Sequence, residues 1–371
     1  MLREYFERFR ADIRKKIETE LKPLTERSDW DNYAKQNFRI LFNMLTQWGL
    51  TGIAYDKELG GHGKTFLEYI IAVEEIAKVD RFIVGPLAVH ALAMHVIHEF
   101  GNTEQYEKYL KPMIRGEKLG AFALTEPDAG SDVRSLKTFA KKVNNGYILN
   151  GSKRFITNGG AADIYIVIAT TDKNSEKYGK TGYIVEKNTN GFIIGKDENK
   201  MGLHGLPTTE IFIEECFVPE SNRLGDEGLG LKIALSSLAT GRISIAAVAL
   251  GLSESVFNIL VDYHKQHENV DQFTALKIAE YYAKLESARQ LIYHAAQLKD
   301  NKIECIKESS AAKLYATDLA MELASATINL TGKNANLERA FCDAKGGQIY
   351  EGTNEIQKLI IAQQLLGKRL F

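Results

Sequence analysis

The sequence predicts a mainly α-helical protein with a β domain in the middle of the chain. Apolar residues recur three and four positions apart from residue 2 to about 118, and again from about 225 to the end, which is the spacing of one helix face. From about 119 to 220 the pattern changes to short runs rich in Ile, Val, Tyr and Phe, as expected for strands. At 371 residues the chain is also too long for one ordinary compact core. We therefore predict three domains, at 1–118, 119–224 and 225–371.

The N-terminal domain is expected to be helical, with breaks at DKELGGHG (56–63) and at the turn formed by Gly101, Asn102 and Thr103. Its first segment, MLREYFERFRADIRKKIETELKP, alternates charged and apolar residues and lacks the apolar core of a signal peptide. We therefore expect a helix of the fold and a cytoplasmic protein. The expected helices are 2–22, 32–49, 66–79, 86–99 and 103–115.

The middle domain is expected to form an antiparallel barrel or sandwich. Gly, Asn, Asp and Lys clusters separate its candidate strands, which are GYILNG, ADIYIVIATT, GYIVEK, GFIIG and TTEIFIEECFV.

The C-terminal domain is expected to contain long helices at 229–265, 273–299, 305–330 and 354–368. The most apolar stretch, 229–261, is interrupted by charged and polar residues, which makes it poorly suited to hydrocarbon. We expect a buried core helix and no insertion into a membrane. The interrupting residues are Lys232, Ser236, Ser237, Thr240, Arg242 and Glu254.

Charge and cysteine content argue against several classes of protein. The formal net charge is -1, and the basic residues are spread along the chain, so a nucleic-acid partner is not expected. Cys216, Cys305 and Cys342 match no zinc or redox spacing and are expected to be free thiols. No metal site is expected either, because His90 lies off the helix face that His95 and His98 share.

Several stretches, taken together and in order, carry a resemblance to a known family. Inside the helix, β, helix layout they resemble the acyl-CoA dehydrogenase family, and the resemblance covers nearly the whole chain. It implies a C-terminal four-helix bundle, one FAD per subunit, a homo-oligomer, an acyl-CoA substrate and an electron-transfer flavoprotein as electron acceptor. The stretches are AFALTEPDAGSD (121–132), GSKRFITNGG (151–160) and GGQIYEGTNEIQ (346–357), supported by YEKYLKPMIRGEKLG, KMGLHGLPTTEIFIEECFVP and GRISIAAVALG.

Two of these stretches are expected to form a cradle for the flavin. In AFALTEPDAGSD a strand runs into a loop whose hydroxyls and backbone amides can face the nitrogens of a ring system. An ordinary turn capped by Asp128 and Ser131 is the competing explanation. The resemblance implies that Ser131 reaches flavin or acyl-CoA and that the aromatic ring of Phe155 lies beside the flavin. The complete predicted cofactor set is Phe122, Leu124, Thr125, Gly130, Ser131, Phe155, Ile156, Thr157, Thr353 and Glu355.

Glu351 is the candidate catalytic base. It precedes a helix whose start is marked by Thr353 and Asn354, and Gly352 lets the backbone come close to a ligand. The α proton of a thioester is weakly acidic, so its base needs a raised pKa in a dry pocket, and the thioester oxygen needs hydrogen-bond donors. The resemblance implies that these donors are the Glu351 N–H and a hydroxyl of the cofactor. A solvated surface glutamate is the alternative.

Some family members place the base on the helix that opens the C-terminal domain, directly before an arginine. Here that position is Gly241, which cannot act as a base and leaves space for Glu351. The neighbouring Arg242 is implied to hold the substrate or to brace the base, with a surface ion pair as the alternative. The predicted substrate-binding residues are Ser131, Leu238, Gly241, Arg242 and Gly352.

Three segments of the family pattern are altered in this chain, and the resemblance implies that the first two would contact the FAD of a neighbouring subunit. Arg-x-x-Phe-Gly is replaced by YHKQHENVDQF, Gln-x-x-Gly-Gly-x-Gly by INLTGKNAN, and Arg-Asp-Ala by Cys342, Asp343 and Ala344. Fewer charge-assisted bonds to the pyrophosphate predict weaker retention of FAD, unless the subunits pack differently or another residue compensates. The candidates for that role are Lys265, His267 and Lys333.

The favoured interpretation is FAD-dependent α,β-dehydrogenation of an acyl-CoA thioester to trans-2-enoyl-CoA, an oxidoreductase reaction of fatty acid metabolism. Glu351 removes the α proton, and the β hydrogen passes as hydride to flavin N5. Two alternatives remain. One is a catalytically impaired, flavin-poor paralogue that acts as a subunit or acyl-CoA-binding protein, and the other is a flavin oxidase on the same fold.

Overall fold

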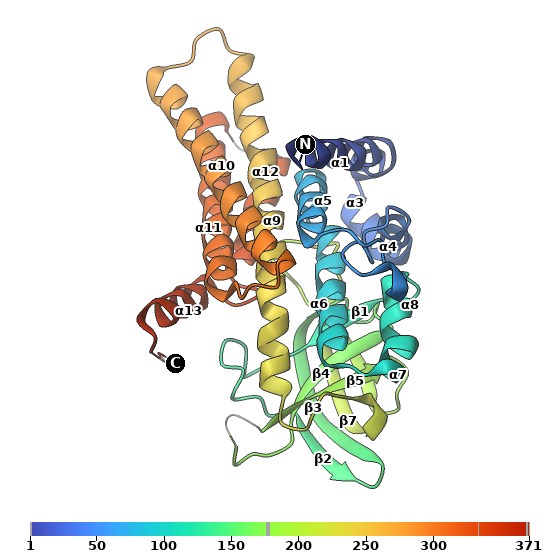
Figure 1. Ribbon diagram of the computed structural model, residues 1–371. Coiled ribbons are helices and arrows are strands. Elements are labelled where there is room, and N and C mark those ends of the chain that lie inside the picture. The colour runs from blue at the N-terminus through green and yellow to red at the C-terminus, as the bar shows by residue number, and fades with distance from the viewer. Residues whose placement is uncertain (1, 176–178, 333, 369, 371) are drawn as a thin grey trace.

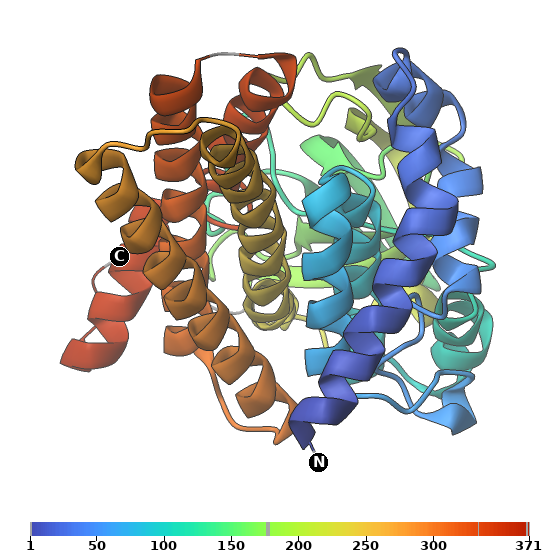
Figure 2. The same cartoon turned by 90° about the horizontal axis from the view of Figure 1, so that it is seen from above.

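The computed structural model describes residues 2–175, 179–332, 334–368 and 370. It confirms the predicted fold class, because helices occupy both ends of the chain and a β domain occupies the middle. Figure 1 shows the sheet at the bottom, the N-terminal helices on the right and the C-terminal helices rising on the left. Figure 2, seen from above, shows the C-terminal bundle and the N-terminal helices side by side over the sheet.

The N-terminal helices follow the predicted ranges, with breaks that periodicity alone did not show. The predicted helix 2–22 passes through a π-helical turn, Ile17–Leu21, and 32–49 is divided at Asn37. A capping box starts α5, in which Glu68 N donates to Thr65 Oγ1 (3.1 Å) and Thr65 N donates to Glu68 Oε2 (2.9 Å). The helices are α1 (Leu2–Lys16), α2 (Lys22–Thr25), α3 (Trp30–Gln36), α4 (Phe38–Gln47), α5 (Phe66–Val79), α6 (Val84–Phe100), α7 (Thr103–Gln105) and α8 (Lys111–Ile114).

The middle domain is one mixed sheet in the order β6-β7-β3-β2-β4-β5-β8, with β1 also paired to β4. Most pairs are antiparallel as predicted, but β1 and β2 both pair in parallel with β4. Strand direction depends on how distant segments pair, so local alternation of side chains could not predict it. The strands are β1 (Gly120–Ala123), β2 (Phe139–Val143), β3 (Gly146–Thr157), β4 (Ile164–Thr170), β5 (Lys180–Glu186), β6 (Phe192–Asp197), β7 (Thr208–Pro219) and β8 (Arg223–Leu224).

The C-terminal region contains one helix more than predicted. The additional α12 has Leu337, Ala340 and Ala344 on its buried face, which is a weak apolar signal in the sequence because two of the three side chains are small. Helix α13 packs against α11 and extends away from the bundle (Figure 1). The helices are α9 (Gly230–Lys265), α10 (Gln272–Asp300), α11 (Ile306–Thr331), α12 (Ala335–Gly347) and α13 (Asn354–Leu366).

Helix α9 is the central helix of the fold. Among the described helices it is the one long and apolar enough to span a membrane by composition, but 72% of its most apolar window is buried inside the protein. It packs against α5, α6, α10, α11 and α12. This agrees with the predicted core helix, and it brings the middle of α9 between the two helical regions.

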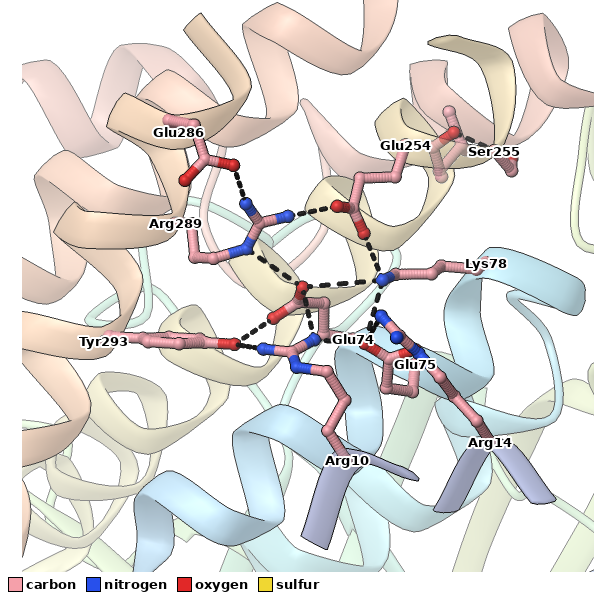
Figure 3. A network of polar contacts seen from close by, with 11 residues as sticks. Arg10, Arg14, Glu74, Glu75, Lys78, Glu254, Ser255, Glu286, Arg289 and Tyr293 are labelled. Carbon is pink, nitrogen blue, oxygen red and sulfur yellow. Dashed lines mark hydrogen bonds and ion pairs between the residues drawn. The ribbon is translucent and has the colours of Figure 1, made fainter. Parts of the chain in front are cut away.

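A network of buried charges joins the N-terminal helices to the bundle (Figure 3). Glu74 of α5 accepts hydrogen bonds from Arg10 of α1 (3.1 Å), Arg289 of α10 (3.1 Å) and the hydroxyl of Tyr293 (2.5 Å). A further ion pair connects Lys78 with Glu254 of α9. Since four helices contribute, the network fixes their relative positions.

Candidate active site

A strained turn before α13 presents Glu351. The backbone has φ of 55° at Glu351 and 86° at Gly352, so two successive residues are in the left-handed region. This conformation costs a non-glycine residue roughly 1–3 kcal/mol and persists only where the surroundings hold it. Helix α13 then begins normally, with Ile356 N donating to Thr353 Oγ1 (3.3 Å). The turn aims the Glu351 side chain inward, toward the middle of α9.

The Glu351 carboxyl lies against the backbone of α9 at Gly241. Its Oε2 is closed to solvent and has no hydrogen-bond partner among the described residues. A Cβ built on Gly241 would collide with that oxygen and would lie 2.9 Å from Glu351 Cδ and 3.1 Å from Leu92 Cδ2. Oε2 of the carboxyl group therefore lies in a space closed to solvent between α6 and α9, which exists because residue 241 has no side chain. The solvated surface glutamate that the sequence left open is excluded.

Replacing Gly241 with Ala tests this geometry. The added methyl group would push the Glu351 carboxyl aside, and a displacement of about 1 Å can cost about 100-fold in rate. We expect at least a tenfold lower catalytic rate. Because the main obstruction is a flexible side chain, the melting temperature should stay close to that of the wild type. A variant with unchanged activity would show that Glu351 acts from another position.

Burial and two cations set the electrostatics of this carboxyl. Burial raises the pKa of Glu351 to about 7, while Arg242 and Lys313 oppose that rise. Arg242 is only 4% exposed, which excludes the surface ion pair considered from the sequence. Its Nη1 lies 3.5 Å from Ser310 Oγ, and burial lowers its pKa to about 10. The carboxyl therefore titrates near neutrality beside a charged guanidinium.

Lys313 of α11 is the site residue that sequence reasoning missed. Its side chain is completely buried, and Nζ donates to Gly352 O (2.9 Å) and to Asn354 Oδ1 (2.8 Å). The sequence does contain a sign of this residue, a single lysine within the largely apolar run SSAAKLYA. On a surface helix, that lysine would be expected to point toward solvent.

A buried lysine, Lys153, holds the loop of the predicted flavin cradle by hydrogen bonds. Lys153 donates to Leu124 O (3.0 Å) and to Glu126 Oε1 (2.7 Å), and Arg154 N donates to Thr125 O (2.8 Å). Glu126 in turn accepts from the backbone N–H groups of the residues at 137 and 138. These contacts fix the path of the loop that follows β1, leaving Gly130 and Ser131 exposed at its tip.

The residues predicted to form the cradle differ in how far their side chains are exposed to a ligand. Phe155 has φ of 58° and is 55% exposed, so a large ring is held outward where a flat ligand could cover it. Thr125, Thr157 and Phe122 are half-buried. Leu124 and Ile156 are packed into the cores, at 8% and 1% exposed, so they can meet a cofactor chiefly through their backbone.

The remaining predicted residues occupy α9 and the first turn of α13. Leu238 is half-buried one turn before Gly241 on α9. The Thr353 hydroxyl caps α13, while Glu355 is exposed in its first turn. Gly352 stays at the strained turn, where its carbonyl accepts from Lys313.

The side chain of His90, a candidate metal ligand in the sequence, is held by hydrogen bonds inside the protein. His90 donates or accepts at both ring nitrogens, with Met113 O (3.0 Å) and Gly120 N (3.0 Å), so it has no nitrogen left for a metal. Within the described parts of the chain, no three His, Cys, Asp or Glu side chains form a group that could hold a metal ion.

The altered FAD segments also have local partners. His267 Nδ1 lies 2.7 Å from Tyr263 O, and Lys265 pairs with Asp262 (3.3 Å). Asp343 is buried and accepts from Leu203 N (2.7 Å). Lys333 lies outside the described residues.

Sequence comparison matches most of the chain to one family. Profiles described as the N-terminal, middle and C-terminal domains of acyl-CoA dehydrogenase match residues 4–117, 121–216 and 228–366. An acyl-CoA dehydrogenase of Bacillus subtilis is 45% identical over 88% of this chain and 89% of its own length. A short-chain specific acyl-CoA dehydrogenase of Clostridium acetobutylicum is 40% identical over 96% of each chain. An NADH-dependent acryloyl-CoA reductase of Anaerotignum propionicum is 39% identical over 94% of this chain and 91% of its own.

Solved structures give the same assignment. Butyryl-CoA dehydrogenase of Megasphaera elsdenii superposes with a TM-score of 0.91 at 39% identity, covering 97% of this chain and 98% of its own. A chain from a study of the electron-transferring flavoprotein of Acidaminococcus fermentans also reaches 0.91, at 38% identity over 98% of each chain. A glutaryl-CoA dehydrogenase of Mycobacterium smegmatis, in complex with FADH2, reaches 0.88 at 28% identity over 99% of this chain and 95% of its own. The protein therefore belongs to the acyl-CoA dehydrogenase family, whose members are FAD-dependent oxidoreductases.

Proposed function

We propose that this protein converts an acyl-CoA thioester to the trans-2-enoyl-CoA, with FAD as cofactor and Glu351 as the base. The observation that carries the proposal is the unpaired Glu351 Oε2, buried against Gly241. A buried carboxyl group with a pKa near 7 and no hydrogen-bond partner is suited to accept a proton from a weak carbon acid.

The residues of the chain supply proton transfer and charge stabilisation. Glu351 removes the proton from the α carbon, and its own N–H, which has no acceptor among the described residues, can donate to the thioester oxygen as negative charge develops there. Arg242 adds a nearby positive charge. FAD, when bound, supplies the acceptor for the hydride from the β carbon. The residues that would hold it are Thr125, Ser131, Phe155 and Thr157, together with the backbone of Leu124 and Ile156.

The base should impose a definite pH dependence. Glu351 accepts a proton only when it is ionised, and burial raises its pKa to about 7. We expect the rate of anaerobic flavin reduction to rise with pH, to be half-maximal near 7 and to level off above it. Stopped-flow measurements between about pH 5.5 and 8.5 check this, since a titration within about one unit of the value is resolvable there. A rate independent of pH over that range would contradict the assignment.

Short acyl chains are the proposed substrates, because close relatives are short-chain specific and butyryl-CoA dehydrogenases. The test is a visible spectrum of the purified protein, repeated anaerobically after acyl-CoAs of short, medium and long chain are added. Butyryl-CoA should bleach the flavin band fastest. A protein that stays colourless after incubation with FAD would instead support the impaired paralogue.

The electron partner is proposed to be an electron-transfer flavoprotein, since a similar chain occurs in the study of such a protein from Acidaminococcus fermentans. The related acryloyl-CoA reductase favours a second direction of the same chemistry, in which Glu351 returns its proton to the α carbon of an enoyl-CoA. Comparing the rate of flavin reduction by butyryl-CoA with the rate of flavin reoxidation by crotonyl-CoA tests the two directions, because a physiological reductase should be faster in the second. Rapid release of peroxide in air would indicate an oxidase.

A further inference from the structure

The turn that carries Glu351 is gripped from α11 by Lys313, a residue that the proposed chemistry does not require. Its Nζ donates to the carbonyl of Gly352 (2.9 Å) and to Asn354 Oδ1 (2.8 Å). Asn354 passes the contact on, because its Nδ2 donates to Asp318 Oδ1 (2.7 Å). Hydrogen bonds thus connect the turn, through Gly352 and Asn354, with two side chains of α11, Lys313 and Asp318.

A second side chain holds the same turn from α13. Gln357 Nε2 donates to Gly352 O (2.8 Å) and lies 3.2 Å from Glu351 O. The carbonyl groups of both left-handed residues are therefore engaged, and that of Gly352 is engaged twice. A backbone in this conformation relaxes unless it is held, so these contacts account for the inward orientation of the Glu351 side chain.

A lysine at this position is energetically unfavourable, because its charge is removed from water. Lys313 is completely buried, and its hydrogen-bond partners are neutral oxygens of Gly352 and Asn354 instead of a carboxylate. A buried ammonium without a directly paired carboxylate is expensive to desolvate. A neutral donor would hold the carbonyl of Gly352 at lower cost, so the positive charge itself needs an explanation.

We propose that Lys313 is a positioning residue of the reaction, which holds the strained turn at 351–352 and, through its charge, keeps the Glu351 carboxyl in its ionised, proton-accepting form. This inference rests on the proposed function and identifies what controls its base. The charged groups that act on the Glu351 carboxyl are Arg242 from α9 and Lys313 from α11, and Glu351 in turn acts on the neighbouring Tyr350 hydroxyl. Those that face Lys313 are Glu351, Arg242, Asp318 and Glu355. Burial lowers the pKa of Lys313 to about 8, while the negative charge of Glu351 opposes that fall and favours the charged lysine.

Three substitutions separate the two roles. Lys313→Arg keeps the charge and a donor, Lys313→Gln keeps a donor without the charge, and Lys313→Met keeps neither. The measurement is the rate of anaerobic flavin reduction by butyryl-CoA as a function of pH. Lys313→Gln should move the half-maximal pH upward by about one unit, the size of effect that one nearby charge produces, while Lys313→Arg should restore it. Lys313→Met should show the same shift and a plateau rate about 10- to 100-fold lower, since the turn is released.

A matched control is Lys284→Met. Lys284 pairs with Glu280 and with Glu322 of α11, so this variant removes a lysine that contacts the same helix away from Glu351. It should leave both the half-maximal pH and the plateau unchanged. Melting temperature and bound flavin are measured for every variant, and Lys313→Gln carries the pH comparison if Lys313→Met does not fold.

The outcomes distinguish this inference from the proposed function. If the wild type is not reduced by any acyl-CoA after FAD is supplied, the proposed function fails. If the wild type is reduced, and Lys313→Gln and Lys313→Met have its half-maximal pH, the charge role of Lys313 is overturned. A lower plateau without any shift would leave only a structural role, which contradicts the proposal as stated.

Discussion

Replacing Glu351 with Gln is expected to slow flavin reduction by butyryl-CoA by about 10²- to 10⁴-fold, the usual contribution of a general base. The amide has nearly the same shape as the carboxyl, so it fits the space beside Gly241, but it cannot accept the α proton. Anaerobic stopped-flow absorbance of wild type and variant, each loaded with FAD, gives the ratio of rates.

Protein stability provides the control for this variant. The folded pKa of Glu351 is raised from 4.5 to about 7, so ionising the group costs more in the folded than in the unfolded state. Its contribution to stability therefore falls as pH rises from the unfolded value through 7. The Gln variant does not ionise, so it should melt no lower than the wild type at pH 8. Equal flavin content with wild-type reduction rates would remove Glu351 from its assigned role.

Replacing Arg10 with Met is expected to lower the free energy of unfolding by about 3–5 kcal/mol, the cost of removing one partner from a buried ion pair. Arg10 donates to Glu74 (3.1 Å) and pairs with Glu75 and Tyr293, which connects α1 with α5 and α10 (Figure 3). Without it, the completely buried Glu74 keeps fewer cations around its charge.

The matched control for Arg10 is Arg27→Met. Arg27 pairs with Asp29 (2.9 Å) at the surface, where water screens the charges and such pairs contribute little to stability. Thermal and denaturant unfolding of both variants, followed by far-UV circular dichroism, gives the comparison. If Arg10→Met loses no more stability than Arg27→Met, the network does not join the helices energetically.

Most of the fold could be predicted from the sequence because its elements are long and regular. The apolar spacing of 229–265 predicted α9 almost to the residue, and the spacing of 66–79 predicted α5. Helix α12 was missed because its buried face is small, and the parallel pairing of β1 and β2 with β4 was missed because it depends on contacts between distant segments.

The candidate site was predictable in part, and for a similar reason. Glu351, Gly241 and Arg242 stand in motifs that resemble a family, so their residue types alone pointed to a base, a space and a cation. Lys313 stands in no such motif, and its role comes from two hydrogen bonds across 39 and 41 positions of the chain. Likewise, only the structure shows that the side chain of Ile156 is directed into the core.

The buried geometry of Glu351 and Arg242 argues against the catalytically impaired alternative, since a non-catalytic protein has no need of an unpaired buried carboxylate. The altered C-terminal segments still predict weaker retention of FAD than in typical members, which dialysis followed by spectroscopy would measure.

Exchange of the α hydrogens of butyryl-CoA with solvent deuterium tests the central claim most directly, because it follows the proton that Glu351 is proposed to remove. The wild-type enzyme with FAD, incubated anaerobically in D2O, should place deuterium on the α carbon, as seen by NMR, and the Glu351→Gln variant should not. Deuterium entering the α carbon equally fast with both proteins would contradict the assignment of Glu351 as the base.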